Sequence, residues 1–146
     1  MQMMLFMTVF FACTVVAHGC SCLEAPLEEM YCRSEYVTRV IVKGEDRSRE
    51  AGPIGFIVYN VEHMKIYKKP GNVQELSTNV TTRGPQSYCG APLEVGYDFL
   101  IGGSLSWNGM LDHSLCDLRE HWDLLSPDEK DRLMCKAFKC GTEACS

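Results

Sequence analysis

The stretch Tyr36-Val-Thr-Arg-Val-Ile-Val42 is β-branched or aromatic at every position except Arg39. A longer run of similar character follows it, Pro53-Ile-Gly-Phe-Ile-Val-Tyr-Asn-Val-Glu-His-Met-Lys-Ile-Tyr67. Branched and aromatic side chains pack well on a pleated sheet, so both runs favour extended strands. The polar residues 43–52 between them are typical of a connecting loop, and Gly55 indicates a bulge or bend in the second strand.

Three more strands are predicted further along the chain, at residues 76–82, 97–105 and 110–116. A Gly/Pro-rich loop, residues 83–92, separates the first of these from the second. The Asn108-Gly109 pair separates the second from the third and is a strong hairpin signal, because both residues tolerate a positive φ.

Helices are predicted on either side of these strands. Residues 24–32 read as a short helix that starts near Pro26, since proline is favoured in a first helical turn. Ser126-Pro-Asp-Glu129 is a capping box that opens a helix to about Phe138. About five short strands with no regular alternation of strand and helix predict a mainly β fold. The architecture expected is a five-stranded OB-type antiparallel barrel with flanking helices, stapled by disulfides.

The first 19 residues have the features of a secretory leader. They contain no Asp, Glu, Lys or Arg, and residues 4–16 form an apolar core that is too short to span a bilayer. Ala17 and Gly19 supply small residues at the −3 and −1 positions of a cleavage site after Gly19. The sequence therefore predicts a signal peptide over residues 1–19 and one secreted domain over residues 20–146. A buried N-terminal helix is the alternative.

The cysteine count agrees with this processing. Removing the leader discards Cys13 and leaves an even set: Cys20, Cys22, Cys32, Cys89, Cys116, Cys135, Cys140 and Cys145. An even set favours disulfides in an oxidising compartment, although eight cysteines can pair in about a hundred ways. The Asn79-Val80-Thr81 sequon also belongs to the secretory route, so Asn79 is a candidate glycosylation site.

Charge and composition exclude several functions. The net charge of −5 argues against a nucleic-acid-binding protein, which normally presents a basic face. No second apolar run has membrane-spanning length, so no membrane partner is expected, and we expect a monomer. Ser87 and Ser104 lack the context of a catalytic nucleophile, so no catalytic residue and no enzymatic activity are predicted.

Cys20 becomes the first residue of the chain if the leader is cleaved after Gly19. Its free α-amino nitrogen and its carbonyl oxygen then flank a single Cα, and together they can close a five-membered chelate on a metal ion. A disulfide at Cys20 would hold this pair rigidly. Such an arrangement in a small secreted protein suggests a group directed at the metal of another protein. A redox Cys20-Ser-Cys22 pair is the less favoured alternative.

Other side chains have ordinary interpretations. A zinc site built from Cys135, Cys140 and Cys145 with His113 or His121 is possible, but disulfides fit these spacings better. His63 and His113 are expected to face solvent. For Trp107, beside the hairpin turn, packing against the hairpin is favoured over a surface contact.

Several motifs occur together in a specific order: Cys20-Ser-Cys22 with Cys32, Lys65-Ile-Tyr-Lys68, Ser87-Tyr-Cys-Gly90, Phe99-Leu-Ile-Gly-Gly-Ser-Leu105, Cys116, Trp122 and Cys140. In this order the sequence resembles the N-terminal inhibitory domain of the tissue inhibitors of metalloproteinases, a member of the netrin-like module family. The similarity extends over essentially all of residues 20–146 and covers that domain only, without the family's second, C-terminal subdomain.

The resemblance implies a specific disulfide pattern. Its pairings are Cys20–Cys89, Cys22–Cys116 and Cys32–Cys140, with Cys135–Cys145 left over as a fourth. In this scheme two segments form a continuous wedge that binds the protease. They are Cys20, Ser21, Cys22 and Leu23, together with Gln86, Ser87, Tyr88 and Cys89.

The resemblance also implies a function, which is inhibition of zinc metalloendopeptidases of the matrix metalloprotease type. The Cys20 amine and carbonyl would ligate the catalytic zinc of the target enzyme, and the inhibitor would need no cofactor of its own. Ser21 would enter the substrate pocket, flanked by Leu23 and Tyr88. The family usually carries a His-Pro-Gln run between the second and third cysteines, whereas this chain carries three carboxylates, Glu24, Glu28 and Glu29. These would alter selectivity or weaken docking. The alternative function is a netrin-like binding module that docks to matrix or host proteins without contacting a zinc ion.

Overall fold

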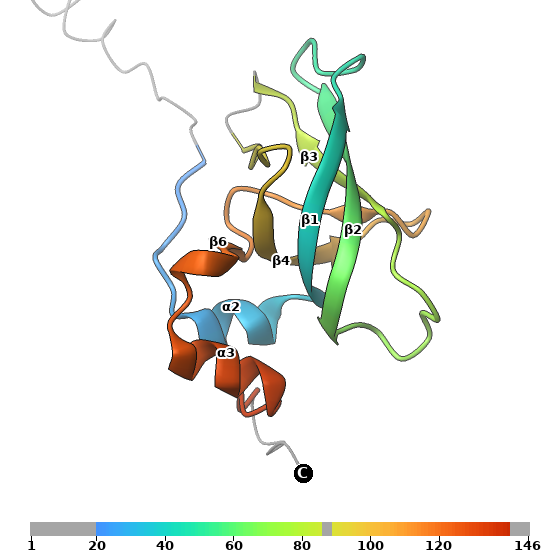
Figure 1. Ribbon diagram of the computed structural model, residues 1–146. Coiled ribbons are helices and arrows are strands. Elements are labelled where there is room, and N and C mark those ends of the chain that lie inside the picture. The colour runs from blue at the N-terminus through green and yellow to red at the C-terminus, as the bar shows by residue number, and fades with distance from the viewer. Residues whose placement is uncertain (1–19, 86–88, 141–146) are drawn as a thin grey trace, which may run out of the picture.

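The computed structural model describes residues 20–85 and 89–140 (Figure 1). Three predictions concern residues outside these ranges: the signal peptide at 1–19, the Gln86-Ser87-Tyr88 part of the wedge, and the pairing of Cys145. The elements, in chain order, are α2 (Leu27–Arg33), β1 (Tyr36–Asp46), β2 (Phe56–Lys68), β3 (Asn79–Arg83), β4 (Asp98–Leu105), β5 (Leu111–Asp112), β6 (Arg119–His121), the 3-10 helix η2 (Trp122–Leu124) and α3 (Pro127–Met134).

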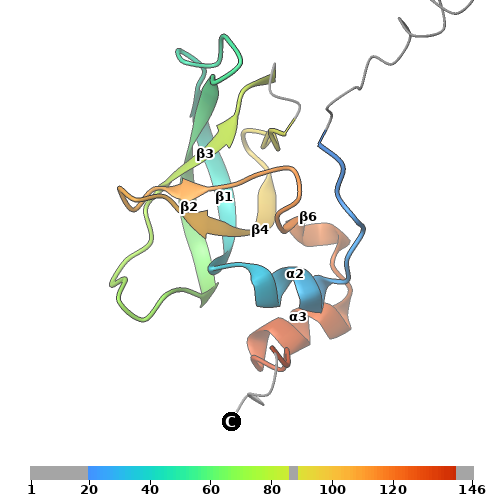
Figure 2. The same ribbon diagram turned by 180° about the vertical axis from the view of Figure 1, so that it is seen from behind.

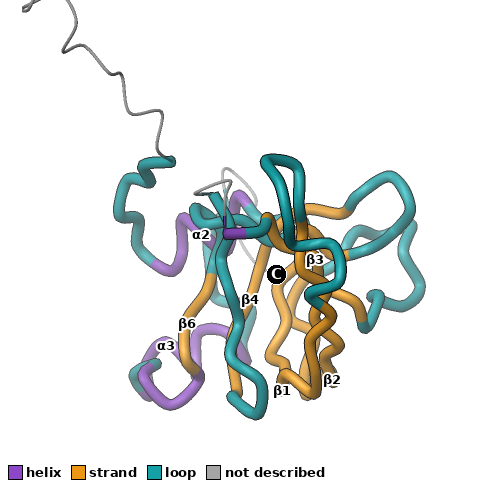
Figure 3. The backbone as a smooth tube through the Cα atoms, turned by 90° about the horizontal axis from the view of Figure 1, so that it is seen from above, coloured by secondary structure: helices purple, strands orange, loops and turns teal. Residues whose placement is uncertain are grey.

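Five strands close into a ring in the order β1-β2-β3-β5-β4, and β4 pairs with β1 to complete it. Four of these pairings are antiparallel, while the short β3–β5 pairing is parallel. This ring confirms the prediction of a mainly β, OB-type five-stranded barrel with flanking helices. Figure 3 looks onto the barrel and shows α2, α3 and β6 together on one side of it.

The two long strands predicted first form the largest ladder of the barrel. Their pairing is interrupted by three register shifts, the last of them between Val42 and Gly44. Such irregularities bend a strand and increase its twist, which allows one long pair to wrap around a small core. Gly55 lies just before β2 and not within it, so the predicted bend belongs to the end of the loop.

The interior of the barrel is filled by alternate residues of the strands, as the period of two requires. Its buried cluster consists of Tyr36, Val40, Val42, Ile57, Tyr59, Val61, Leu76, Val80, Leu93, Phe99, Ile101 and Leu111. A second cluster lies between the barrel wall and the helices, and contains Leu27, Tyr31, Val37, Tyr67, Leu100, Leu118, Leu125, Leu133 and Phe138. The helices therefore cover an outer face of β1 and β4 (Figure 2).

The start of α3 agrees with the sequence prediction, but its end does not. The predicted capping box is present, because Ser126 accepts a hydrogen bond from the Glu129 backbone and the Glu129 carboxylate accepts one in return. The helix stops at Met134, earlier than predicted, and Lys136 has a φ of 52°. The chain can then turn back, so that Phe138 is buried against Tyr31 with ring centroids 4.9 Å apart.

Substituting Gly103 is expected to destabilise the barrel where β4 pairs with the start of β1. A Cβ at Gly103 would collide with the Asp112 carbonyl oxygen and press on the Tyr36 ring. For Gly103→Ala we expect the free energy of unfolding, measured by chemical denaturation, to fall by about 1–3 kcal/mol or more.

Gly44→Ala is the matched control, since a Cβ there meets nothing within 4 Å. Glycine weakens a strand relative to alanine by roughly 0.5–1 kcal/mol, so this variant should be neutral or slightly stabilised. Equal losses in the two variants would contradict the packing described for Gly103.

Candidate functional site

The segment from Cys20 to Pro26 is an extended chain with no strand partner, and it runs beside the barrel toward α2 (Figure 1). Its first four residues are exposed, and Leu23 retains 91% of its accessible surface. Apolar burial therefore contributes little to holding this segment in place. Covalent links must do so.

Two disulfides join this segment to two different loops. Cys20 is bonded to Cys89 and Cys22 to Cys116, with Cα–Cα distances of 5.3 and 5.2 Å. A third bond, Cys32–Cys140, joins the end of α2 to the C-terminal segment with a Cα–Cα distance of 5.0 Å. These are the three pairings that the resemblance implied.

The two loops that receive these disulfides also bind each other. The Leu115 backbone N–H donates to the Cys89 carbonyl oxygen over 3.0 Å, and Gly90 forms a β-bridge with Ser114. Three segments thus lie side by side: residues 20–23, 89–90 and 114–116. We call them the N-terminal ridge. The predicted wedge did not include residues 114–116. The implied Cys22–Cys116 disulfide already indicated that this segment lies beside residues 20–23.

Hydrogen bonds fix the ridge to the barrel. The Ala91 N–H donates to the Thr82 hydroxyl over 2.8 Å, and the His113 N–H donates to the Thr81 carbonyl over 2.9 Å. The Arg33 guanidinium at the end of α2 donates to the Cys116 carbonyl. Both loops of the ridge are therefore positioned by β3, and the second is also positioned by α2.

His113, at the base of the ridge, is buried with 1% exposure, so the expectation that it faces solvent is wrong. Nδ1 lies 2.9 Å from the Gly102 carbonyl oxygen, which makes it the protonated nitrogen, and buried Nε2 has no hydrogen-bond partner within the described residues. Burial lowers the pKa of His113, because a charged imidazolium would lose its hydration. His63 is half-buried and bonded to Thr38 and the Ser77 carbonyl, so its prediction was wrong as well.

Two further side chains differ from expectation. Trp107 is 98% exposed at the tip of the β4–β5 hairpin, so the favoured packing of this ring is wrong. Glu28 is directed away from the ridge, because its carboxylate pairs with Arg132 and accepts the Lys139 backbone N–H. Of the three carboxylates that the sequence singled out, Glu24 and Glu29 are exposed.

The zinc site considered as an alternative cannot use Cys140 as a ligand. Cys140 is bonded to Cys32, and in residues 20–85 and 89–140 no group of three His, Cys, Asp or Glu side chains is placed to hold a metal ion. Cys135 is exposed and forms no disulfide with a described cysteine. The Cys135–Cys145 bond stays a prediction, since Cys145 lies outside the described residues. In the part of the chain that is described, no helix is long and apolar enough to cross a membrane.

The barrel and the ridge define a class of protein, a small OB-type barrel that carries an exposed, disulfide-anchored N-terminal segment. The family described as "Tissue inhibitor of metalloproteinase" matches residues 18–146, and the chain belongs to this family. This match confirms the resemblance found in the sequence.

Individual relatives agree with the family match. Metalloproteinase inhibitor 3 of Xenopus laevis is 32% identical over 75% of this chain and 50% of its own length. Metalloproteinase inhibitor 2 of Gallus gallus is 30% identical over 88% of this chain and 64% of its own length. The chain therefore spans about half to two thirds of these relatives. The crystal structure of Ancylostoma ceylanicum excretory-secretory protein 2 matches 78% of the chain and 98% of its own, at 21% identity and a TM-score of 0.45.

We expect the stability of the protein to depend on pH through His113. Its pKa in the folded state lies below the ordinary value of about 6.5, so the unfolded chain binds a proton first as the pH falls. The free energy of unfolding should stay constant above pH ~6.5 and decrease below it, by at most about 1.4 kcal/mol per pH unit.

Denaturation curves between pH 7 and pH 5 measure this slope, since the carboxylates with lowered pKa values, Glu28, Asp46 and Glu129, titrate at lower pH. The His113→Asn variant keeps an N–H donor at the position of Nδ1, facing the Gly102 carbonyl, but cannot titrate. Its slope in this range should be smaller than that of the unsubstituted protein. Identical slopes would show that His113 does not control the pH dependence.

Proposed function

We propose that this protein is a secreted inhibitor of zinc metalloendopeptidases that acts through the α-amine and carbonyl of Cys20. The observation that carries the proposal is the combination of exposure and restraint at Cys20. The residue is exposed, yet its side chain is bonded to Cys89. Two residues further along the chain, Cys22 is bonded to Cys116. Cleavage after Gly19 would free the amine at this restrained position.

The chemistry needs only the backbone of Cys20. A catalytic zinc keeps one coordination position open for water and substrate, and a neutral amine can displace that water. The ordinary pKa of an α-amine is about 7.7–8.0, so zinc binding can remove its proton near neutral pH. The adjacent carbonyl oxygen completes the chelate.

The rest of the ridge would supply apolar contact with the protease. Leu23 is 91% exposed and Leu115 is 41% exposed, so both have surface available for burial in a complex. Ser21 would lie in the substrate pocket next to the zinc, and Gln86, Ser87 and Tyr88 would extend the contact from the Cys89 loop. Because two disulfides restrain the ridge in advance, little conformational entropy is lost on docking, which favours tight binding.

The acidic residues near the ridge are a smaller obstacle than their sequence suggested. Glu28 is neutralised by Arg132, and its pKa is lowered by the hydrogen bonds from the Lys139 backbone and from Arg132. Glu24 and Glu29 remain as exposed charges, and they would select against proteases with an acidic rim.

A second candidate function is a binding module that contacts no zinc. The exposure of Trp107, on a hairpin outside the ridge, favours this candidate, because exposed tryptophans are common at the centres of protein interfaces. This candidate does not require a free amine at Cys20. The two functions are therefore separable by changing the N-terminus alone.

One added alanine before Cys20 should abolish inhibition, because the Cys20 nitrogen becomes an amide that cannot ligate zinc. Secreted protein with a verified N-terminus is titrated against a panel of matrix metalloproteases, in parallel with the extended form. Inhibition only by the form that starts at Cys20 supports chelation. Equal inhibition by both forms would reject it, and no inhibition by either would favour the binding module.

Leu23→Ala should weaken inhibition without affecting the fold. Leu23 makes little contact within the protein, so the free energy of unfolding should change by less than about 0.5 kcal/mol. Losing a buried isopropyl group in the complex costs roughly 1–2 kcal/mol, which corresponds to an inhibition constant about 5–30-fold higher.

Leu124→Ala is the matched control, since Leu124 is 76% exposed but lies on η2, outside the ridge. It should leave both stability and inhibition unchanged. Loss of inhibition in the Leu124 variant, or none in the Leu23 variant, would place the protease contact elsewhere.

A further inference from the structure

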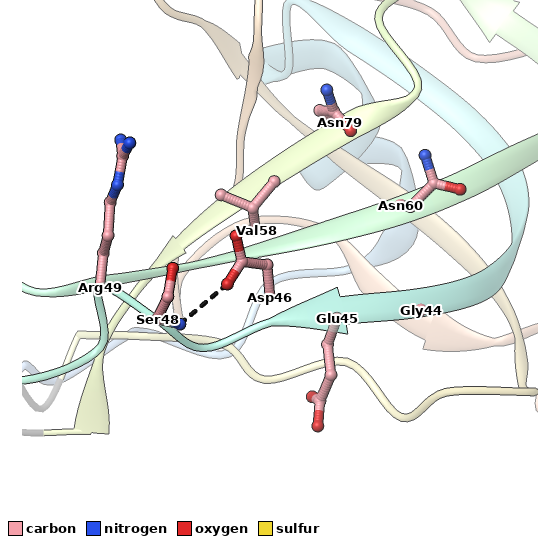
Figure 4. A pocket seen from close by; sticks show the side chains of 8 residues that line it. All are labelled: Gly44, Glu45, Asp46, Ser48, Arg49, Val58, Asn60 and Asn79. Atoms are coloured by element: carbon pink, nitrogen blue, oxygen red, sulfur yellow. Dashed lines mark hydrogen bonds between the residues drawn. The ribbon is translucent and has the colours of Figure 1, made fainter.

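A hollow of about 540 Å³ lies on the outer surface of the barrel, where the end of β1 and the following loop meet β2 and the start of β3 (Figure 4). It is lined by Gly44, Glu45, Asp46, Ser48, Arg49, Val58, Asn60 and Asn79. None of these residues belongs to the N-terminal ridge.

The strand register explains why the surface is hollowed at this position. Gly44 pairs with Asn60, and Asn60 pairs with Asn79, so these three residues form one row across three strands. Gly44 contributes no side chain to the row, and a Cβ built there meets nothing within 4 Å. The hollow is therefore open above Gly44 and is bounded by the Asn60 and Asn79 amides.

The neighbouring row supplies an apolar floor and further polar groups. Asp46 pairs with Val58, and Val58 pairs with Thr81. The Asp46 carboxylate accepts the Ser48 backbone N–H over 2.9 Å, which fixes the edge of the hollow (Figure 4). An apolar patch surrounded by an amide, a carboxylate and a hydroxyl suits a sugar ring, which has an apolar face and a polar rim.

Asn79 is the first residue of the sequon Asn79-Val80-Thr81. The sequon lies in β3, where successive side chains point to opposite faces of the barrel wall. Val80 is fully buried in the barrel core, whereas Asn79 is exposed at the hollow, and Thr81 is on the same outer face. We propose that Asn79 carries an N-linked glycan, and that its first N-acetylglucosamine residues lie in this hollow over Val58, against Asn60 and Asp46. The proposal rests on the secretory route included in the proposed function.

The covalent step is an ordinary glycosyl transfer. The Asn79 amide nitrogen forms a bond to the anomeric carbon of an oligosaccharide carried on a lipid pyrophosphate. The bond between that carbon and the phosphate oxygen breaks, and the lipid pyrophosphate leaves with the electron pair. The amide nitrogen loses one proton, so no oxidant or reductant is needed.

The glycan would not obstruct the ridge. Asn79 and Arg83 are the two ends of β3, which separates them by roughly 13 Å at about 3.3 Å per residue. The ridge loop follows the Arg83 end, while the hollow lies at the Asn79 end. Inhibition and glycosylation should therefore be independent, so the failure of one proposal does not imply the failure of the other.

The first experiment tests the modification. The full chain, leader included, is secreted from eukaryotic cells, and its mass is measured before and after treatment with a peptide N-glycanase under denaturing conditions. One glycan is expected on the unsubstituted protein and on the control Asn72→Gln, which is exposed and does not line the hollow, and none on Asn79→Gln. Secreted protein that carries no glycan at Asn79 would overturn the proposal, whatever its inhibitory activity.

The second experiment tests the position of the sugar. The N-glycanase is applied to the folded glycoprotein, where a glycan seated in the hollow should be released at least about 10-fold more slowly than from denatured protein. Gly44→Leu fills the hollow and should restore fast release. Gly71→Leu, where a Cβ also meets nothing within 4 Å, is the control and should stay slow. Fast release from the unsubstituted folded protein, or equal rates for the two variants, would show that the sugar does not occupy the hollow.

Discussion

The pair of disulfides at Cys20 and Cys22 is the constraint on which the site depends. The segment that carries them is exposed, so no buried side chain holds it in place. The bonds close loops of 69 and 94 residues, each worth about 4–5 kcal/mol on the chain-entropy model. The two disulfides take the role that apolar burial plays in a buried segment, and they hold the backbone of residues 20–22 at an exposed position.

The barrel makes this anchoring useful, because it brings the two receiving loops together. Cys89 and Cys116 lie far apart in the chain, but one loop follows β3 and the other follows β5, and these strands are neighbours. The parallel β3–β5 pairing places both strand ends at the same edge, where the Leu115 N–H meets the Cys89 carbonyl. The ridge can therefore form only when the barrel is closed through the β3–β5 pairing.

The sequence predicted the parts of the fold that local patterns control, namely the long strands, the Asn108-Gly109 turn and the capping box of α3. It missed β6, because Arg119-Glu-His121 has no strand character and is extended only through its pairing with β4. His113 and Trp107 were misjudged for a similar reason. The burial of the His113 ring and the exposure of the Trp107 ring depend on how strands distant in the sequence pack together. A short sequence pattern does not contain this information.

The burial of His113 connects the ridge to the stability of the barrel. Its ring donates to the Gly102 carbonyl of β4, its backbone N–H is bonded to β3, and Ser114, which pairs with Gly90, comes directly after it. Asp112, Asp117 and Arg119 are the charged groups that act on the imidazole. A proton on Nε2 would lie in a site without an acceptor among the described residues, so protonation of His113 would destabilise the base of the ridge. The neutral state of this one ring therefore supports the ridge segment 114–116, in addition to the Cys22–Cys116 disulfide.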